Sequence, residues 1–101
     1  MKKVINGKLY NTQTAQSHAS RDNHCLPNDF HYVEEPLYRK KTGEFFLYAC
    51  GGALSIYAEH FARGSRGSSR IVPLTEAEAR EWAESYADAD SYIEIFGAVE
   101  E

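Results

Sequence analysis

The sequence has few of the features by which secreted, membrane-bound or disulfide-stabilised proteins are recognised. Only two cysteines, Cys25 and Cys50, occur among its 101 residues, and both are expected to stay as thiols in a reducing cytosol. No apolar run approaches the roughly 20 residues that span a bilayer. The opening MKK leads straight into VING, without the long apolar segment of a secretion signal or membrane anchor. These absences predict a cytoplasmic protein without membrane contact.

Motifs for phosphate binding and nucleophilic catalysis are absent from the sequence as well. Gly51-Gly52 is followed neither by the Lys-Ser/Thr of a phosphate loop nor by a G-x-G-x-x-G pattern, so we interpret it as a chain break. Ser55 lies just beyond this pair, and no base can be assigned to activate it. We therefore expect a protein that is not an enzyme and that uses no cofactor.

The loop predicted between Ser20 and Phe30 contains His24 and Cys25, which form a possible metal-ligand set together with His18 before the loop and His31 after it. Structural zinc sites usually contain closely spaced pairs such as C-x₂₋₄-C or H-x₃₋₅-H, whereas the next cysteine here is Cys50. The adjacent side chains of His24 and Cys25 are expected to point apart, which disfavours a catalytic dyad. No metal site is predicted, and a small enzyme or metal protein is the least favoured of three interpretations.

The chain is predicted to form one α+β domain covering residues 1–101. Hydrophobic residues make up 43% of the chain, which is enough for a modest core. Aromatic residues make up 13% and include seven tyrosines. Because tyrosine fills core edges and also makes good contact surface, this excess favours a protein that binds a partner. The oligomeric state is left open by the sequence.

A β-hairpin is predicted at the centre of the fold, with strands over Pro36–Lys40 and Glu44–Cys50. Gly43 in the connecting turn permits the positive φ that short hairpin loops often need. Residues 45–49 are apolar or aromatic without a charge, so the second strand is expected to be central and covered on both faces. Pro36 has no N–H for the ladder, so the first strand should begin there or lie at an edge.

The segments on either side of this hairpin complete the predicted sheet. Asn6-Gly7 between two apolar pairs predicts a tight hairpin of strands Lys2–Ile5 and Lys8–Asn11. Short helices are expected over Gln13–Ala19 and Ala53–Ala62. A further strand over Ser69–Val72 is expected to stop at Pro73.

Two helices are predicted at the C-terminus. Thr75 and Glu78 form a capping box, after which Ala79, Trp82, Ala83 and Tyr86 should face the sheet. A second helix, Ser91–Phe96, is expected to be capped by Asp90 and ended by Gly97. Its buried residues should be Tyr92, Ile93, Ile95 and Phe96. A frayed tail is expected over Ala98–Glu101. The predicted fold is a small antiparallel β-sheet with short helices packed mainly on one face.

Charge is distributed unevenly along the chain, although the formal net charge is only −4. Residues 76–101 contain nine acids and Arg80 alone, whereas residues 1–75 contain ten bases and six acids. The C-terminal acids fit either an ordinary solvated helix or a surface that a basic partner recognises. The candidate partner-binding residues are Glu76, Glu81, Glu84, Asp88 and Asp90.

Several stretches together resemble a family of small proteins encoded by bacterial phages and mobile elements. They are VINGKLYNT at residues 4–12, LYR at 37–39 with GEFFL at 43–47, GGA at 51–53, and IVPLTE at 71–76 with Trp82. The resemblance implies a setting rather than an activity. Small acidic proteins from that setting include inhibitors of host defence, among them anti-CRISPR proteins that bind an effector complex and block its access to DNA.

The leading hypothesis is therefore a non-enzymatic inhibitor that binds a host protein complex, such as a CRISPR–Cas effector, through its acidic surface. The second is a nucleic-acid-binding accessory protein that uses two basic clusters, which requires both clusters to lie on one side of the molecule. A sequence pI near 5.5 disfavours direct nucleic-acid binding, because such domains usually carry net positive charge. The basic clusters are Arg39, Lys40 and Lys41, and Arg63, Arg66 and Arg70.

Overall fold

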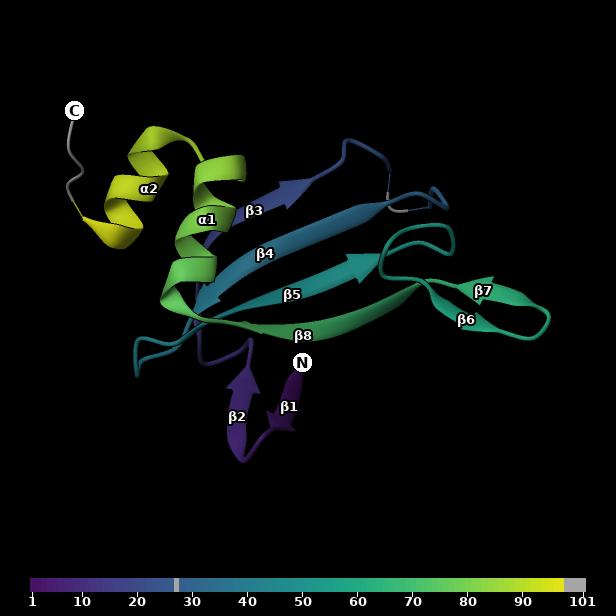
Figure 1. Cartoon of the computed structure of the whole chain (residues 1–101), viewed down its shortest axis with the longest axis horizontal. Coiled ribbons are helices and arrows are strands. Elements are labelled where there is room, and N and C mark those ends of the chain that lie inside the picture. The colour runs from purple at the N-terminus through teal and green to yellow at the C-terminus, as the bar shows by residue number, and fades with distance from the viewer. Residues whose placement is uncertain (27, 98–101) are drawn as a thin grey trace.

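The computed structural model describes residues 1–26 and 28–97, so the tail predicted over residues 98–101 lies outside the described part (Figure 1). The described residues form eight strands and two helices. The strands are β1 (Lys2–Ile5), β2 (Lys8–Asn11), β3 (Gln16–Asp22), β4 (Val33–Arg39), β5 (Phe45–Gly51), β6 (Glu59–Phe61), β7 (Gly64–Arg66) and β8 (Ser68–Leu74). The helices are α1 (Glu76–Tyr86) and α2 (Ala89–Phe96). No helix among them has the length and hydropathy needed to cross a membrane.

A four-stranded antiparallel sheet in the order β3-β4-β5-β8 dominates the fold, and the hairpins β1–β2 and β6–β7 form two smaller sheets. This architecture confirms the predicted α+β class. β5 lies inside the sheet between β4 and β8, and Phe45, Phe46, Leu47 and Ala49 are buried along it, as the uncharged run predicts. Figure 1 shows α1 and α2 at one end of the sheet and the β6–β7 hairpin projecting from the other.

The two faces of the sheet carry separate clusters of buried side chains, because neighbouring residues of a strand point to opposite faces. On one face the helices pack over strands β4 and β5. That cluster comprises Leu37, Phe45, Leu47, Ala79, Trp82, Ala83 and Ile95. On the other face Phe46 packs with Ile71 of β8 and with Tyr10 of the β1–β2 hairpin. The Asn6-Gly7 turn has positive φ at both residues (51° and 78°), as predicted.

Two predicted helices are wrong. The segment predicted as the helix Gln13–Ala19 instead leads into β3, which pairs along β4 from Gln16 opposite Arg39 to Asp22 opposite Glu34. Its apolar stripe consisted of two alanines, so pairing with a strand outweighed a weak local helix preference. The segment predicted as the helix Ala53–Ala62 forms turns and then β6. Its apolar residues do not share one buried face, since Leu54 and Phe61 are 57% and 54% exposed while Tyr57 and Ala58 are partly buried.

Both prolines of the sheet lie inside strands, contrary to the prediction. Pro36 is the fourth residue of β4, an inner strand, and the recorded register between β4 and β5 skips Glu35 and Pro36. Pro36, which has no backbone N–H, therefore lies where the pairing between β4 and β5 is interrupted. Pro73 pairs with Phe46 within β8, which continues to Leu74. It is tolerated because β8 is at the edge of the four-stranded sheet and is paired on one side only.

The helix boundaries agree with the predicted capping box but not with the second cap. Thr75 accepts from the backbone N–H of Glu78 (3.1 Å), and Glu78 accepts from that of Thr75 (2.9 Å). α2 begins at Ala89 with Asp88 as its N-cap, so the assignment of the cap to Asp90 is wrong. Gly97 ends α2 with a φ of 92°, as predicted.

Only part of each predicted helical face is buried. Ala79, Trp82 and Ala83 of α1 belong to the core, but Tyr86 is 50% exposed and lies against the Trp82 ring. In α2, Ile95 is buried, Tyr92 and Phe96 are partly buried, and Ile93 is 43% exposed. The two short helices therefore cover a narrower strip of the sheet than their apolar residues could.

Removing the α1 cap is expected to weaken the whole domain, because α1 contributes three buried residues to the core. Thr75→Ala leaves the N–H of Glu78 without its acceptor, and we expect a loss of about 1 kcal/mol in the free energy of unfolding. Urea denaturation monitored through Trp82 fluorescence measures this loss. Thr75→Ser keeps the hydroxyl and should retain most of the stability; equal losses in both variants would contradict a capping role.

Candidate functional site

The two C-terminal helices bring all five predicted partner-binding residues to the surface. Glu76, Glu81 and Glu84 come from α1, Asp88 from the junction, and Asp90 from α2, and all are exposed. We call these five residues the acidic surface. Arg80 lies one helical turn after Glu76, and its guanidinium is 3.8 Å from the Glu76 carboxylate. This pair offsets part of the charge at the start of α1, so uncompensated negative charge is concentrated toward Glu84 and Asp88.

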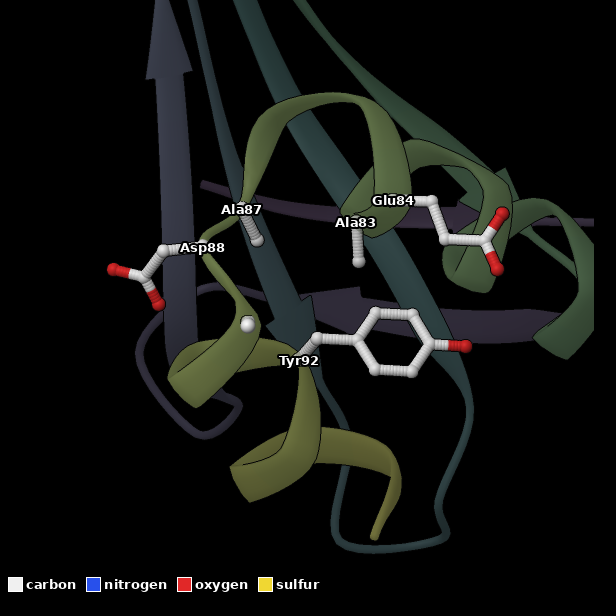
Figure 2. Close-up of a pocket in the computed structure, with 6 residues that line it drawn as sticks. Ala83, Glu84, Ala87, Asp88 and Tyr92 are labelled. Atoms are coloured by element: carbon white, nitrogen blue, oxygen red, sulfur yellow. The ribbon is translucent and has the colours of Figure 1, made fainter. Parts of the chain in front are cut away.

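A small apolar groove lies between these two carboxylates. It has a volume of about 360 Å³ and is lined by Ala83, Glu84, Ala87, Asp88, Ala89 and Tyr92. In Figure 2 the side chains of Glu84 and Asp88 point away from each other on opposite sides of the groove, with the ring of Tyr92 between the helices. We call this feature the interhelical groove. It combines an apolar floor with negative charge at both rims.

The groove exists because the chain changes direction with small side chains on both helices. Ala87 ends α1 in an extended conformation (φ −90°, ψ 155°), and Asp88 at once starts α2 by accepting from the backbone N–H of Ser91 at 2.7 Å. That hydrogen bond, supported by the Ser91 hydroxyl, holds the pKa of Asp88 below its usual value, so the carboxylate stays charged. Alanines at 83, 87 and 89 leave the space between the helices open.

The two basic clusters do not come together. The first lies at the β4–β5 turn, next to the end where Phe45 pairs with Leu74, and the second lies at the end where Gly51 pairs with Ser68. The length of β5 separates these ends by about 20 Å. Figure 1 shows the β4–β5 turn and the β6–β7 hairpin on opposite sides of the molecule. The geometric condition for the nucleic-acid hypothesis is therefore not met.

Several of these basic side chains also have partners within the protein. The guanidinium of Arg39 lies over the Phe45 ring, and the ammonium of Lys40 lies 3.6 Å from the centroid of the Tyr10 ring. The guanidinium of Arg66 forms a two-bond pair with Glu59, with both nitrogens 3.1 Å from carboxylate oxygens. A phosphate would have to compete with these contacts.

The histidines and Cys25 considered as metal ligands occupy different settings. His18 lies at a bulge of β3, whereas His24, Cys25 and His31 lie in the loop before β4. Within residues 1–26 and 28–97, no group of three or more His, Cys, Asp or Glu residues is arranged to hold a metal ion. Cys50 is half-buried, and this burial raises the pKa of its thiol, which makes it less reactive.

Sequence reasoning missed an apolar surface at the end of the molecule far from the helices. Its five large side chains are between 54% and 70% exposed: Leu26, Phe30, Leu54, Ile56 and Phe61. We call these residues the distal apolar surface. The available signal was partial: Leu54 and Phe61 belong to the apolar stripe of the segment predicted as the helix Ala53–Ala62, together with Tyr57 and Ala58. Leu54 and Phe61 of that stripe are exposed, whereas Tyr57 and Ala58 are partly buried.

A buried carboxylate was also missed. Glu35 on β4 is only 4% exposed and is contacted by Arg21, Tyr57 and Trp82. The alternation of β4 contained the signal, because Val33 and Leu37, two residues to either side, are both buried. A glutamate at such a position must have partners. It joins β3, β4, the loop before β6 and α1.

Comparison of this chain with protein-family models, with curated proteins and with solved structures finds no match in any of the three.

Proposed function

We propose that this protein acts without catalysis, by binding a basic surface of a host complex through its acidic surface, and that it is an inhibitor of host defence of the anti-CRISPR kind. A CRISPR effector holds nucleic acid in a positively charged channel. The acidic surface would occupy the lysines and arginines that otherwise contact DNA phosphates. The phage or mobile-element setting comes from the sequence resemblance, and the mode of action comes from the charge.

The observation that carries this proposal is the exposure of every carboxylate on the two helices. Residues 76–97 contain seven acidic residues, all exposed, and a single base, Arg80. Such an arrangement attracts a basic surface over a distance and repels acidic ones. An ordinary solvated helix usually carries charges of both signs, and i,i+4 pairs between them stabilise it. Among the described residues, α1 has only one such pair, Glu76–Arg80.

The interhelical groove adds a specific contact to this long-range attraction. Arginine and lysine have apolar stems with a charged end. Such a side chain can lay its stem on the floor formed by Ala83, Ala87 and Tyr92 and place its charge beside Glu84 or Asp88. Charge-assisted hydrogen bonds of this kind are among the stronger polar contacts between proteins.

The test is size-exclusion chromatography of the protein mixed with a purified CRISPR effector complex, with and without target DNA. We expect co-elution that target DNA abolishes and that weakens as the salt concentration rises. Glu84→Lys should raise the dissociation constant at least about tenfold, because it places like charges against each other in the interface. Glu84 is preferred to Asp88 for this test because Asp88 also caps α2.

The matched control is Glu94→Lys, which makes the same change in charge at an exposed residue of α2 that does not line the groove. It should bind nearly as well as the wild type. Equal weakening by both variants would contradict the acidic surface as the binding site, because net charge alone would then explain the binding. Co-elution regardless of DNA would contradict competition with phosphates, and no co-elution with several effector types would overturn the proposed target.

A further inference from the structure

The distal apolar surface contains the two most exposed large hydrophobic side chains among the described residues. Leu26 and Ile56 are each 70% exposed, Phe30 is 65% exposed, and Leu54 and Phe61 exceed half. Half of the ten large hydrophobic side chains that are exposed among the described residues lie here. Large apolar side chains left exposed at one end of a domain are candidates for contact with another molecule.

Hydrogen bonds hold the segments of this surface in fixed positions. The backbone N–H of Leu54 donates to the carbonyl of Phe30 at 2.7 Å, and the guanidinium of Arg70 donates to the carbonyl of Ile56 at 3.3 Å. The hydroxyl of Ser65 on β7 donates to the carbonyl of Ala53. These bonds fix residues 53–56 against the loop before β4, against β7 and against β8, so the base of the β6–β7 hairpin is held in place.

The β6–β7 hairpin ends in a residue pair suited to a groove of opposite charge. Phe61 pairs with Gly64 at the last position of the ladder, and Arg63 lies in the turn between them. Both side chains are exposed, and no ion pair of Arg63 occurs among residues 1–26 and 28–97. The hairpin thus presents an aromatic ring and a cation at its tip.

The opposite end of the same protein has the complementary features. The interhelical groove offers about 360 Å³, near the lower limit of pockets that hold small ligands, with alanines and Tyr92 as its floor. Glu84 and Asp88 supply negative charge at its rims. The molecule is 49 Å long, and its helices and its β6–β7 hairpin lie at opposite ends of that axis, so the hairpin reaches a groove only in another copy (Figure 1).

We propose that copies of this chain associate head to tail, with Phe61 of one copy in the interhelical groove of the next and Arg63 paired with Glu84 or Asp88. The interface is heterologous, because it joins two different surfaces. Each added copy leaves one groove and one hairpin open, so the assembly extends or closes into a ring. Assembly also covers part of the acidic surface, which makes self-association and the binding of a basic partner mutually exclusive at each groove.

Sedimentation velocity over a range of concentrations is the first measurement. The wild type should show an average mass that rises with protein concentration and falls with added salt. Phe61→Ser removes the hairpin anchor, and Glu84→Lys reverses one rim of the groove; each should weaken self-association by about tenfold or more. Val4→Ser, which changes another exposed apolar residue (65%) on the separate β1–β2 hairpin, should behave as the wild type.

Mixing the two weakened variants tests the head-to-tail geometry directly. The Phe61→Ser variant keeps a native groove, and the Glu84→Lys variant keeps a native hairpin. An equimolar mixture should therefore form a dimer and nothing larger, because the hairpin left open lacks its phenylalanine and the groove left open has a reversed charge at one rim. A mixture that stays monomeric while the wild type assembles would overturn this geometry.

A further variant tests whether Glu84→Lys acts through the interface or by destabilising α1. Exchanging the charges within one chain, Arg63→Glu with Glu84→Lys, should restore the assembly that Glu84→Lys alone loses. A wild type that remains monomeric at about 1 mM, the limit of weak specific binding, would overturn the proposal. Its failure is separable from failure of the proposed function, because Phe61→Ser should still bind the effector through an intact acidic surface.

Discussion

Glu35→Ala is expected to lower the free energy of unfolding by about 3–5 kcal/mol, because it removes one partner of a buried ion pair. The Glu35 side chain is 6% exposed and that of Arg21 is 19% exposed, with 3.0 Å between the Arg21 Nε and the carboxylate. The indole N–H of Trp82 donates to the same oxygen at 3.1 Å, and the Tyr57 hydroxyl donates to the other oxygen. All three donors would lose their acceptor at once.

The loss should be large because three donors share one buried carboxylate. Among the residues that the structure describes, every buried side-chain nitrogen and oxygen has a hydrogen-bond partner. The guanidinium of Arg21 also lies over the Tyr86 ring, 4.6 Å from its centroid. Because Trp82 and Tyr86 belong to α1, the same substitution should loosen the helix that carries Glu84 and so weaken partner binding.

Urea denaturation of Glu35→Ala and of Glu59→Ala measures the effect against a matched control. Glu59 also pairs with an arginine, Arg66, but the two side chains are 53% and 68% exposed. An exposed pair of this kind contributes about 0–1 kcal/mol. Similar losses in the two variants would show that the Glu35 network does not behave as a buried one.

Phe46→Ala is expected to cost about 3–5 kcal/mol, the range found when a buried phenylalanine is truncated. Its side chain is fully buried on the sheet face opposite the helices. The Tyr10 ring meets it edge-on with centroids 5.4 Å apart, and the Tyr38 ring stacks on it at 5.3 Å. Truncation leaves a cavity and removes both aromatic contacts.

This substitution should also detach the β1–β2 hairpin, because Tyr10 holds that hairpin against the sheet through Phe46. An isolated two-stranded hairpin is at best marginally stable in water. Hydrogen exchange of the amides of β1 and β2 should therefore accelerate more than exchange in β5. Leu54→Ala, at a side chain that is 57% exposed, should leave both stability and exchange nearly unchanged. Unaltered exchange in β1–β2 of the Phe46 variant would contradict this coupling.

Elements whose signals are local were predictable from the sequence. The Asn6-Gly7 turn requires positive φ at two adjacent residues, and that dipeptide adopts it with little strain. The capping box of Thr75 and Glu78 needs only residues three positions apart. The uncharged run from Phe45 to Ala49 fits only a strand covered on both faces. The exposure of the acids on α1 was also predictable, because the helical period places them on the side of the helix away from its apolar residues.

Elements that depend on distant partners were decided by the tertiary structure. β3 is a strand because β4 offers it a ladder. Residues 53–62 are not a helix because their apolar residues do not share one buried face: Leu54 and Phe61 are exposed, whereas Tyr57 contacts the buried Glu35. The role of Glu35 required Arg21, Tyr57 and Trp82 to meet from four parts of the chain. The interhelical groove and the separation of the two basic clusters are likewise spatial. Local sequence thus determined turns, caps and the central strand, whereas the surfaces available for binding depended on which segments pack together, since burial is a property of neighbours in space.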